Sequence, residues 1–138
     1  MAITSGLCFS FKKELFEAIH DFNTDTFKAA LYTSSANIDP QTTAYTTSGE
    51  LATGGGYTAG GVTLTGATVN LSNGIAFVDF DNAIWTSVNF TANGILVYNA
   101  SKADRAVFVQ NFGTVQASSG NFVYRFPENT STFAIIRI

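Results

Sequence analysis

The stretch that decides the fold is IAFVDFDNAIWTSVNFTANGILVYNASKADRAVFVQNF, which runs from Ile75 to Phe112. Its apolar, β-branched and aromatic runs are separated by DN, ANG and NASKAD, where Gly, Asn and Asp supply the backbone angles of turns. From Ile84 to Phe90 apolar positions alternate with mixed ones, as in a half-buried strand. The run from Ile95 to Tyr98 is apolar throughout, which predicts burial on both faces within two layers. The stretch therefore predicts a β-meander.

Further strands are predicted on both sides of this meander. Residues 26–33 alternate in polarity, and Asn73-Gly74 is the strongest hairpin signal, joining a run through Val69 and Leu71 to residues 75–80. A turn over residues 117–120 should precede a strand over 122–126, and residues 133–138 should form the last strand. Eight to ten short strands predict a mainly β domain of the β-sandwich or jelly-roll type.

One amphipathic helix is predicted near the N-terminus, over residues 10–22. Ser10 is placed to cap its first turn, and Lys13 precedes Glu17 by four residues on the outer face. The apolar positions of this segment share one face and are Phe11, Leu15, Phe16, Ile19 and Phe22. We expect that face to pack against the β core.

The longest irregular stretch covers residues 34–61 and contains Pro40 and six of the chain's 12 glycines. A loop of this length inside a compact domain is typical of a binding arm, a segment ordered by a partner, or a lid. The alternative is a mobile surface loop, because Gly, Thr and Ser tracts are often only mobile. Tyr45 and Tyr57 favour an arm that packs on something.

Composition limits the class of protein. At 138 residues and 14.7 kDa the chain is expected to be one domain, residues 1–138, with a core that needs no disulfide or metal. Only 12% of residues are charged, about half the usual share, so much of the surface should be Thr, Ser, Asn and Gly or be covered by another subunit. The net charge of -3 and the pI near 4.8 argue against a nucleic-acid partner.

Targeting signals are not expected. The lone Cys8 cannot form an internal disulfide, and the N-terminal segment carries no positive charge before its short apolar run, so no secretory signal is predicted. No apolar run approaches the roughly 18 residues that would span a bilayer, so we expect no membrane partner.

Residues that could carry chemistry are sparse. His20 is the only histidine, and Cys8 lies in an apolar run where a buried thiol is inert. The sequence DFDN at 79–82 is better explained by turn chemistry than by a calcium loop, and Gly54-Gly55-Gly56 lacks the Lys-Ser/Thr of a phosphate-binding loop. The 13 phenylalanines favour core packing over ligand stacking. The sequence therefore predicts no catalytic residue, no metal site and no cofactor.

Several strings together resemble a known family. DTFKAALYTS, GYTAGG and YNASKADRAV carry most of the resemblance, which covers nearly the whole chain. The chain resembles small virion proteins of tailed bacteriophages, and within that group it is similar to the capsid cement, or decoration, proteins of short-tailed phages. Those proteins are jelly-roll-like, sit on the outside of an icosahedral shell, often as dimers or trimers, and clamp neighbouring major capsid proteins. The family has no catalytic motif to carry over.

The resemblance implies a virion structural protein, made in the host cytoplasm, whose partners are the major capsid protein and one or two copies of itself. The arm over residues 40–61, with Tyr45 and Tyr57, is the first candidate for shell contact, and the helix with Lys12 and Lys13 is the second. Ile138 is a further candidate contact, because an apolar C-terminal strand is expected either to tuck in or to pair with a partner.

Two other functions remain open. The first is a component of the tail, the head–tail junction or the fibre base, which is equally structural but present in few copies. The second is a carbohydrate-binding β-sandwich, in which exposed Trp85, Tyr45 or Tyr57 would stack on sugars.

Overall fold

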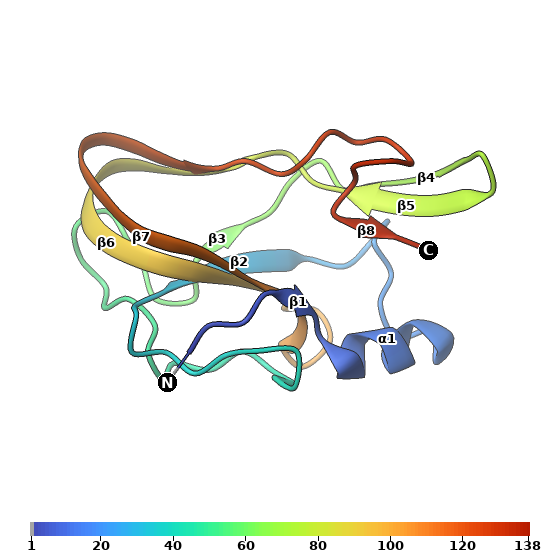
Figure 1. Cartoon of the computed structure of the whole chain (residues 1–138), viewed down its shortest axis with the longest axis horizontal. Coiled ribbons are helices and arrows are strands. Elements are labelled where there is room, and N and C mark those ends of the chain that lie inside the picture. Colours follow the sequence, from blue (N-terminus) through green and yellow to red (C-terminus); the bar gives the residue numbers. More distant parts are fainter. Residues whose placement is uncertain (1) are drawn as a thin grey trace.

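Two antiparallel sheets and a short helix make up the fold of the computed structural model, which describes residues 2–138 (Figure 1). The larger sheet has the strand order β1-β7-β6-β2-β3 and the smaller has the order β4-β5-β8. In chain order the elements are β1 (Gly6–Leu7), α1 (Phe9–Phe16), β2 (Phe27–Tyr32), β3 (Val62–Thr63), β4 (Thr68–Ser72), β5 (Ile75–Asp79), β6 (Ala83–Asn99), β7 (Arg105–Tyr124) and β8 (Ile136–Arg137). The predicted mainly β fold with an N-terminal helix is confirmed.

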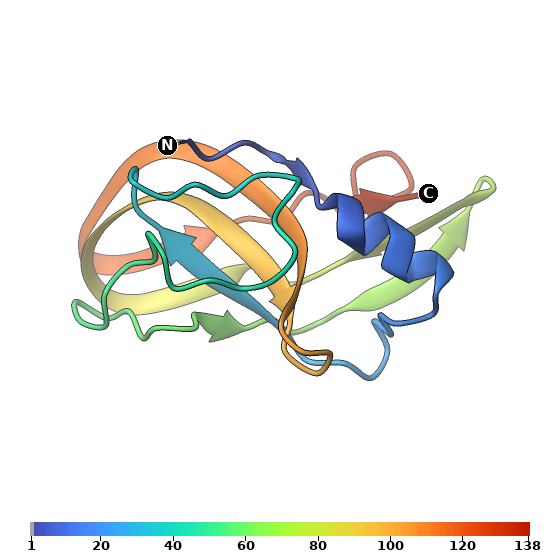
Figure 2. The ribbon, with the colours of Figure 1, turned by 90° about the horizontal axis from the view of Figure 1, so that it is seen from below.

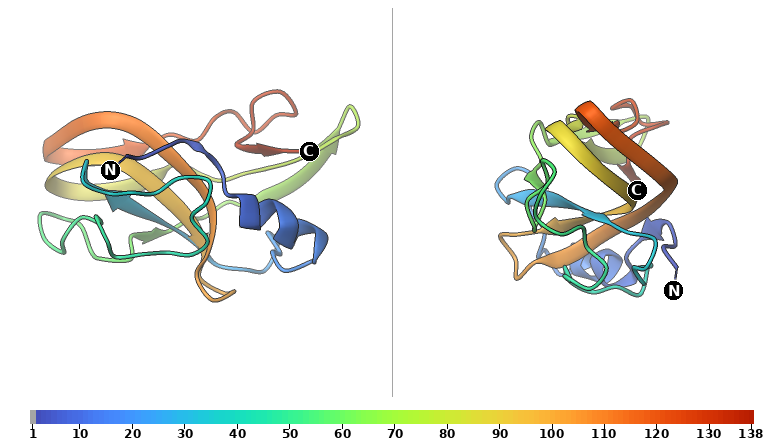
Figure 3. Two further views of the ribbon diagram at one scale, coloured as in Figure 1. Left: turned by 60° about the horizontal axis from the view of Figure 1, so that its bottom comes forward. Right: turned by 90° about the vertical axis from the view of Figure 1, so that its left-hand side faces the viewer.

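β6 and β7 pair to form one long two-stranded ribbon, which folds back so that its two halves lie in different layers of the fold. They pair from Ala83 opposite Tyr124 to Asn99 opposite Arg105. Figures 1 and 3 show the ribbon curling back at one end of the molecule, so that its outer half lies over its inner half. Four register shifts in the ladder and the positive φ angles of Ser87 (52°) and Ser119 (60°) allow this bend. The core lies between the two halves.

Two predicted turns, over residues 92–94 and 117–120, are wrong. Both segments lie inside strands, and two of the eight strands are 17 and 20 residues long rather than short. The Gly, Asn and Ser residues that favour turns are used here for bulges and bends within the ribbon. By contrast, the hairpin at Asn73-Gly74 is confirmed, because it joins β4 to β5 with φ angles of 54° and 74°.

The central strand segment 95–98 is buried on both faces, as its sequence predicted. Its four side chains are at most 3% exposed. One face looks toward the core, and segment 34–61 runs across the outer face of the larger sheet (Figure 2), where Tyr45 stacks on Tyr98 with ring centroids 4.7 Å apart. This segment is irregular apart from isolated bridges, as expected. The arm thus forms a third, irregular cover over the sheet.

The helix is shorter than predicted. α1 ends at Phe16 rather than at residue 22, and Ala18 has a left-handed φ of 58°. Cys8, not Ser10, is the N-cap, and Phe16 is 95% exposed instead of widening the buried stripe. A continued helix would direct His20 far around the axis from Glu14, six residues earlier. The break at Ala18 lets both side chains meet inside the protein.

The segment after α1 still packs as the apolar pattern suggested. Phe22 stacks on Phe27 with a centroid distance of 4.5 Å and an interplanar angle of 3°. At the C-terminus the regular strand covers only Ile136–Arg137, so most of the predicted strand over 133–138 is wrong. No helix within residues 2–138 is both long and apolar enough to cross a membrane.

Candidate interaction surface

An apolar groove lies between α1 and the smaller sheet. It has a volume of about 140 Å³ and is lined by Leu15, Phe22, Val69, Ala76, Phe77, Val78, Ile136 and Ile138. Figures 1 and 2 place α1, the β4–β5 hairpin and the C-terminus at the same end of the molecule. Every lining side chain is hydrophobic, so the groove offers shape and apolar surface but no group for chemistry.

Strand register explains how the smaller sheet forms one wall of this groove. Residues directly opposite each other in antiparallel strands share a face of the sheet. The ladders, together with the two backbone hydrogen bonds between Ala76 and Ile138 (2.8 and 3.1 Å), therefore align apolar side chains in rows. The first row is Val69, Val78 and Ile136, and the second is Leu71, Ala76 and Ile138.

The two rows differ in how far the rest of the protein covers them. Val78 and Ile136 in the first row are 5% and 3% exposed. In the second row, nearer the tip of the hairpin, Leu71 is 75% exposed and Ile138 is 73% exposed. Val69 belongs to the first row but lies on the edge strand, and it is 51% exposed. We call Val69, Leu71, Ala76 and Ile138 the apolar end face. Grouped exposed apolar side chains of this kind are typical of interaction surfaces.

The two lysines proposed for partner contact lie on α1 and are exposed. Lys13 pairs with Glu17 at 2.7 Å, as the spacing predicted, and Lys12 lies over the ring of Phe9 at 5.5 Å from the centroid. Both contacts are local to the helix, so each ammonium group remains accessible at the surface. Their role as contact residues stays a prediction.

The two tyrosines of the arm are instead engaged within the chain. Glu50 accepts hydrogen bonds from the hydroxyls of Tyr45 (2.6 Å) and Tyr57 (2.5 Å) and from the backbone N–H of Gly60 (2.6 Å). Tyr57 is 1% exposed, and burial with the Glu50 carboxylate raises the pKa of its hydroxyl. Burial likewise raises the pKa of Tyr98 to about 12, and its hydroxyl donates to the carbonyl of Gly60. The arm is therefore fastened to its own sheet.

Replacing Glu50 by glutamine should loosen the arm, because Glu50 joins three of its residues. The amide cannot accept from both tyrosines and Gly60 at once, so we expect a loss of about 2 kcal/mol in the free energy of unfolding. Hydrogen exchange of residues 45–61 should accelerate more than exchange elsewhere. Glu128→Gln, on an exposed loop residue, is the matched control and should change neither quantity. Unchanged exchange of the arm in Glu50→Gln would contradict this assignment.

His20 belongs to a buried polar cluster. Its side chain is 0% exposed, with Nε2 2.8 Å from Glu14 Oε1 and Nδ1 3.0 Å from the amide nitrogen of Asn99. Because the Asn99 nitrogen is a donor, Nδ1 accepts and Nε2–H donates to Glu14. Glu14 also accepts from Arg105 at 2.9 Å. Both ring nitrogens are engaged, so this histidine links Glu14 of α1 to Asn99 at the end of β6. It has no free nitrogen for a substrate.

Asp25 belongs to the same buried cluster as His20 and Asn99. Its carboxylate accepts from Asn99 (2.8 Å) and from Lys102 (2.9 Å). Although partial burial alone would raise the pKa of Asp25, the hydrogen bonds from Asn99, the backbone and Lys102 lower it overall. Cys8 is separate and buried; burial, with the carboxylates of Asp39 and Glu14, raises the pKa of its thiol to about 12. The thiol is therefore protonated at neutral pH and a poor nucleophile.

The acidic residues of the sequence DFDN serve separate structural purposes. Asp79 Oδ1 accepts from the backbone N–H of Phe80 at 2.9 Å, Asp81 accepts from Thr65 at 3.3 Å, and the Asn82 side chain accepts from the N–H of Phe126 at 2.9 Å. Across residues 2–138 no group of three or more His, Cys, Asp or Glu side chains could hold a metal ion.

Asp79→Asn should stabilise the protein. Asp79 is 1% exposed, and its Oδ2 has no hydrogen-bond partner within the described chain. Burial raises the pKa of its carboxyl group above the usual value, although the backbone N–H groups of Phe80 and Ile135 act in the opposite direction. A carboxyl group with a raised folded-state pKa costs stability once the pH exceeds its unfolded pKa, and that cost is absent below it. We expect a gain of about 1 kcal/mol at pH 7 that shrinks as the pH falls toward 4. Thermal unfolding at several pH values checks this, and a gain independent of pH would contradict it.

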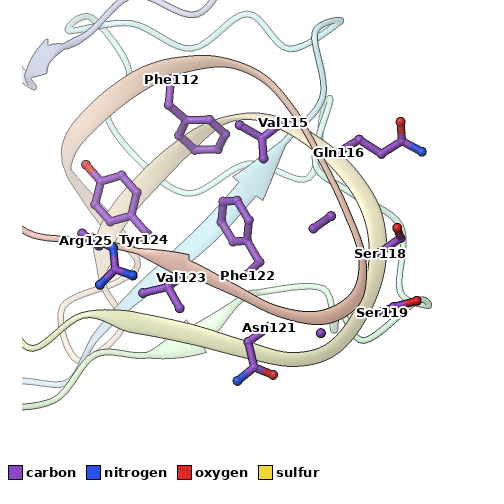
Figure 4. A pocket seen from close by; sticks show the side chains of 12 residues that line it. Phe112, Val115, Gln116, Ser118, Ser119, Asn121, Phe122, Val123, Tyr124 and Arg125 are labelled. Atoms are coloured by element: carbon purple, nitrogen blue, oxygen red, sulfur yellow. The ribbon is translucent and has the colours of Figure 1, made fainter.

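A larger hollow lies inside the bend of the ribbon. It measures about 630 Å³ and is lined by Phe112 and by residues 115–125 (Figure 4). The ring of Phe112 packs against two others there, with its centroid 5.8 Å from that of Phe122 and 6.3 Å from that of Tyr124. Phe122 and Tyr124 are each 8% exposed, so this wall is part of the core rather than an open stacking platform.

The aromatic residues named for the carbohydrate hypothesis are also covered. Trp85 is 3% exposed and Tyr57 is 1% exposed, while Tyr45 is stacked on Tyr98. A sugar stacked on any of the three would first have to displace protein. The structure therefore gives that hypothesis no exposed platform at these positions.

Sequence reasoning included Ile138 among the candidate contacts and missed Leu71 and Ala76, which the structure places beside it. The alternation in TVNLS could have indicated an apolar face, but not that helix and core would leave the face uncovered. Comparison of the chain with protein-family models, with curated proteins and with solved structures gave no match in any of the three.

Proposed function

We propose that this chain is a structural protein of a tailed-phage virion, a capsid cement or decoration protein that binds the outside of the shell and stabilises contacts between major capsid proteins. The single observation that carries the proposal is the apolar end face, with its three large side chains 51% to 75% exposed. The resemblance of the strings quoted above supports a role as a virion protein of a tailed phage. The apolar end face supports binding through a hydrophobic contact.

The chemistry of the surface favours binding to a protein rather than turnover of a small molecule. Burying a large aliphatic side chain contributes roughly 1.5 to 3 kcal/mol, and Val69, Leu71 and Ile138 can each contribute part of this amount to a partner. No charged residue occurs among the lining side chains of the groove, so an apolar protein surface can enter without stripping water from an ion. Many copies on one shell would add their weak contacts through multivalency.

The proposal changes which part of the chain is the first candidate for shell contact. Glu50 ties residues of the arm over 40–61 to one another. The larger sheet holds the arm through the N–H of Leu31, which donates to the buried Tyr57 hydroxyl, and through the Tyr98 hydroxyl, which donates to the carbonyl of Gly60. The exposed end of the smaller sheet with α1 is better placed, and it includes Ile138 and adjoins the helix that carries Lys12 and Lys13.

The experiment is to add purified protein to shells that lack it, count the bound copies and measure the melting temperature of the shell. A cement protein should bind in hundreds of copies per shell and raise the melting temperature. Binding of a handful or about a dozen copies would point to the tail, the junction or the fibre base instead. No binding to any part of the virion would overturn the proposal.

A further inference from the structure

We infer that β4 pairs with β4 of a second copy of this chain, antiparallel and across a two-fold axis at Asn70. β4 is the outer strand of the smaller sheet, paired only with β5 on its inner side. All five of its residues, Thr68 to Ser72, are exposed. An exposed edge strand with apolar side chains and no charge is the kind that pairs with another chain.

The free edge presents a complete set of backbone hydrogen-bonding groups. Ala76 of β5 exchanges both of its backbone hydrogen bonds with Ile138, so its N–H and C=O point away from β4. Leu71, opposite Ala76, therefore directs its own N–H and C=O outward, and so does Val69 two residues earlier. These four groups are spaced for one more antiparallel strand.

The sequence of β4 is self-complementary, which argues for a second copy as the occupant. Around the central Asn70 lie two aliphatic residues, Val69 and Leu71, and then two hydroxyl residues, Thr68 and Ser72. A two-fold axis at Asn70 places Val69 opposite Leu71 of the second copy and Thr68 opposite Ser72 of the second copy. Each symmetric contact is thus made twice between like side chains, as an isologous interface requires. β4 has no charged residue, so self-pairing brings no like charges together.

Pairing in this register also extends the apolar end face. Three strands from each copy would form one sheet of six, because β4 is the edge of both. The row Leu71, Ala76 and Ile138 would continue into the row Val69, Val78 and Ile136 of the second copy. The combined face is twice as wide and carries the groove beside α1 from both copies.

The other sheet edges are less suited to pairing. β1, β3 and β8 are each two residues long, and short edge strands are one way in which proteins avoid association. The outer edge of β7 beyond Gln110 is interrupted by left-handed residues at Gly113 and Ser119. β4 pairs with β5 along all five of its residues and has no left-handed residue between Thr68 and Ser72.

A pair of double variants tests both the edge and the register. Val69→Lys with Leu71→Lys would place lysine opposite lysine in the proposed pairing, at both symmetric contacts. Val69→Lys with Leu71→Glu would place lysine opposite glutamate at the same contacts, and it differs from the first variant at one residue. Both positions are more than half exposed, so circular dichroism and the melting temperature should report a folded chain in each case.

Sedimentation or light scattering should give the unmodified protein a mass of twice 14.7 kDa at micromolar concentration. The dilysine variant should dissociate, with a dimer dissociation constant at least about 100-fold higher, and the lysine–glutamate variant should remain dimeric. A monomeric unmodified protein or a dimeric dilysine variant would overturn the inference, and a monomeric lysine–glutamate variant would overturn the register. No shell is used, so this test and the test of shell binding can fail independently.

Discussion

Gly61→Ala is expected to destabilise the protein by at least about 3 kcal/mol, enough to threaten folding. A Cβ atom on Gly61 would lie 1.8 Å from the carbonyl oxygen of Ala29 and 2.8 Å from Cα of Ala30. Both neighbours are backbone atoms of β2, the strand that holds β3 in the larger sheet. Gly61 also has a φ of +83°, which an L side chain adopts at a cost of about 1 kcal/mol or more. Denaturant unfolding measures the loss.

Gly74→Ala separates the two causes. Gly74 has a similar φ of +74°, but a Cβ there would have no atom within 4 Å. This variant should therefore lose only the conformational part, about 1 kcal/mol. Equal losses at the two glycines would show that close approach of the strands has no role at Gly61.

Glu14→Ala is the second substitution with a large expected effect, a loss of about 3 kcal/mol. Glu14 is 6% exposed and accepts from the buried His20 and from Arg105. Its removal leaves the Nε2–H of a fully buried ring without an acceptor, which costs about 1 to 3 kcal/mol by itself. The Arg105 side chain is 42% exposed, so water replaces part of that contact and limits the additional loss.

Glu17→Ala is the matched control on the same helix. It removes the same charge and the same side chain, but Glu17 pairs only with exposed Lys13. Such a pair contributes about 0.5 kcal/mol or less. Chemical denaturation of the two variants gives the comparison directly. A loss at Glu17 as large as that at Glu14 would mean that helix charge, and not the buried cluster, accounts for the effect.

The parts of the fold that local sequence determines were predictable. Asn73-Gly74 forms the hairpin because both residues accept a positive φ, and residues 95–98 are buried because no polar side chain interrupts them. The bends of the ribbon were not predictable as bends. Gly, Asn and Ser serve a turn and a bulge equally well, and only pairing over the whole ribbon decides between them.

The candidate surface was predictable only in part. The sequence predicted Ile138 as a contact because it ends an apolar segment, and the structure places it in a row with Leu71 and Ala76. α1 ends at Phe16, and the chain beyond it is placed by a long-range contact between His20 and Asn99. Tyr57 was expected to meet a partner, yet its partner here is Glu50 in the same arm. Such pairings between distant residues leave no mark in a single sequence.

The most direct test of the account compares Ala76→Asp with Ile84→Asp for binding to shells that lack the protein. Ala76 is exposed in the middle of the apolar end face, whereas Ile84 is an exposed apolar residue of β6 outside that face. Both variants add one carboxylate at an exposed position. The account predicts that Ala76→Asp loses at least about 90% of bound copies at a concentration that saturates the unmodified protein, while Ile84→Asp binds normally. Normal binding of Ala76→Asp would contradict the assignment of the apolar end face as the shell-binding surface.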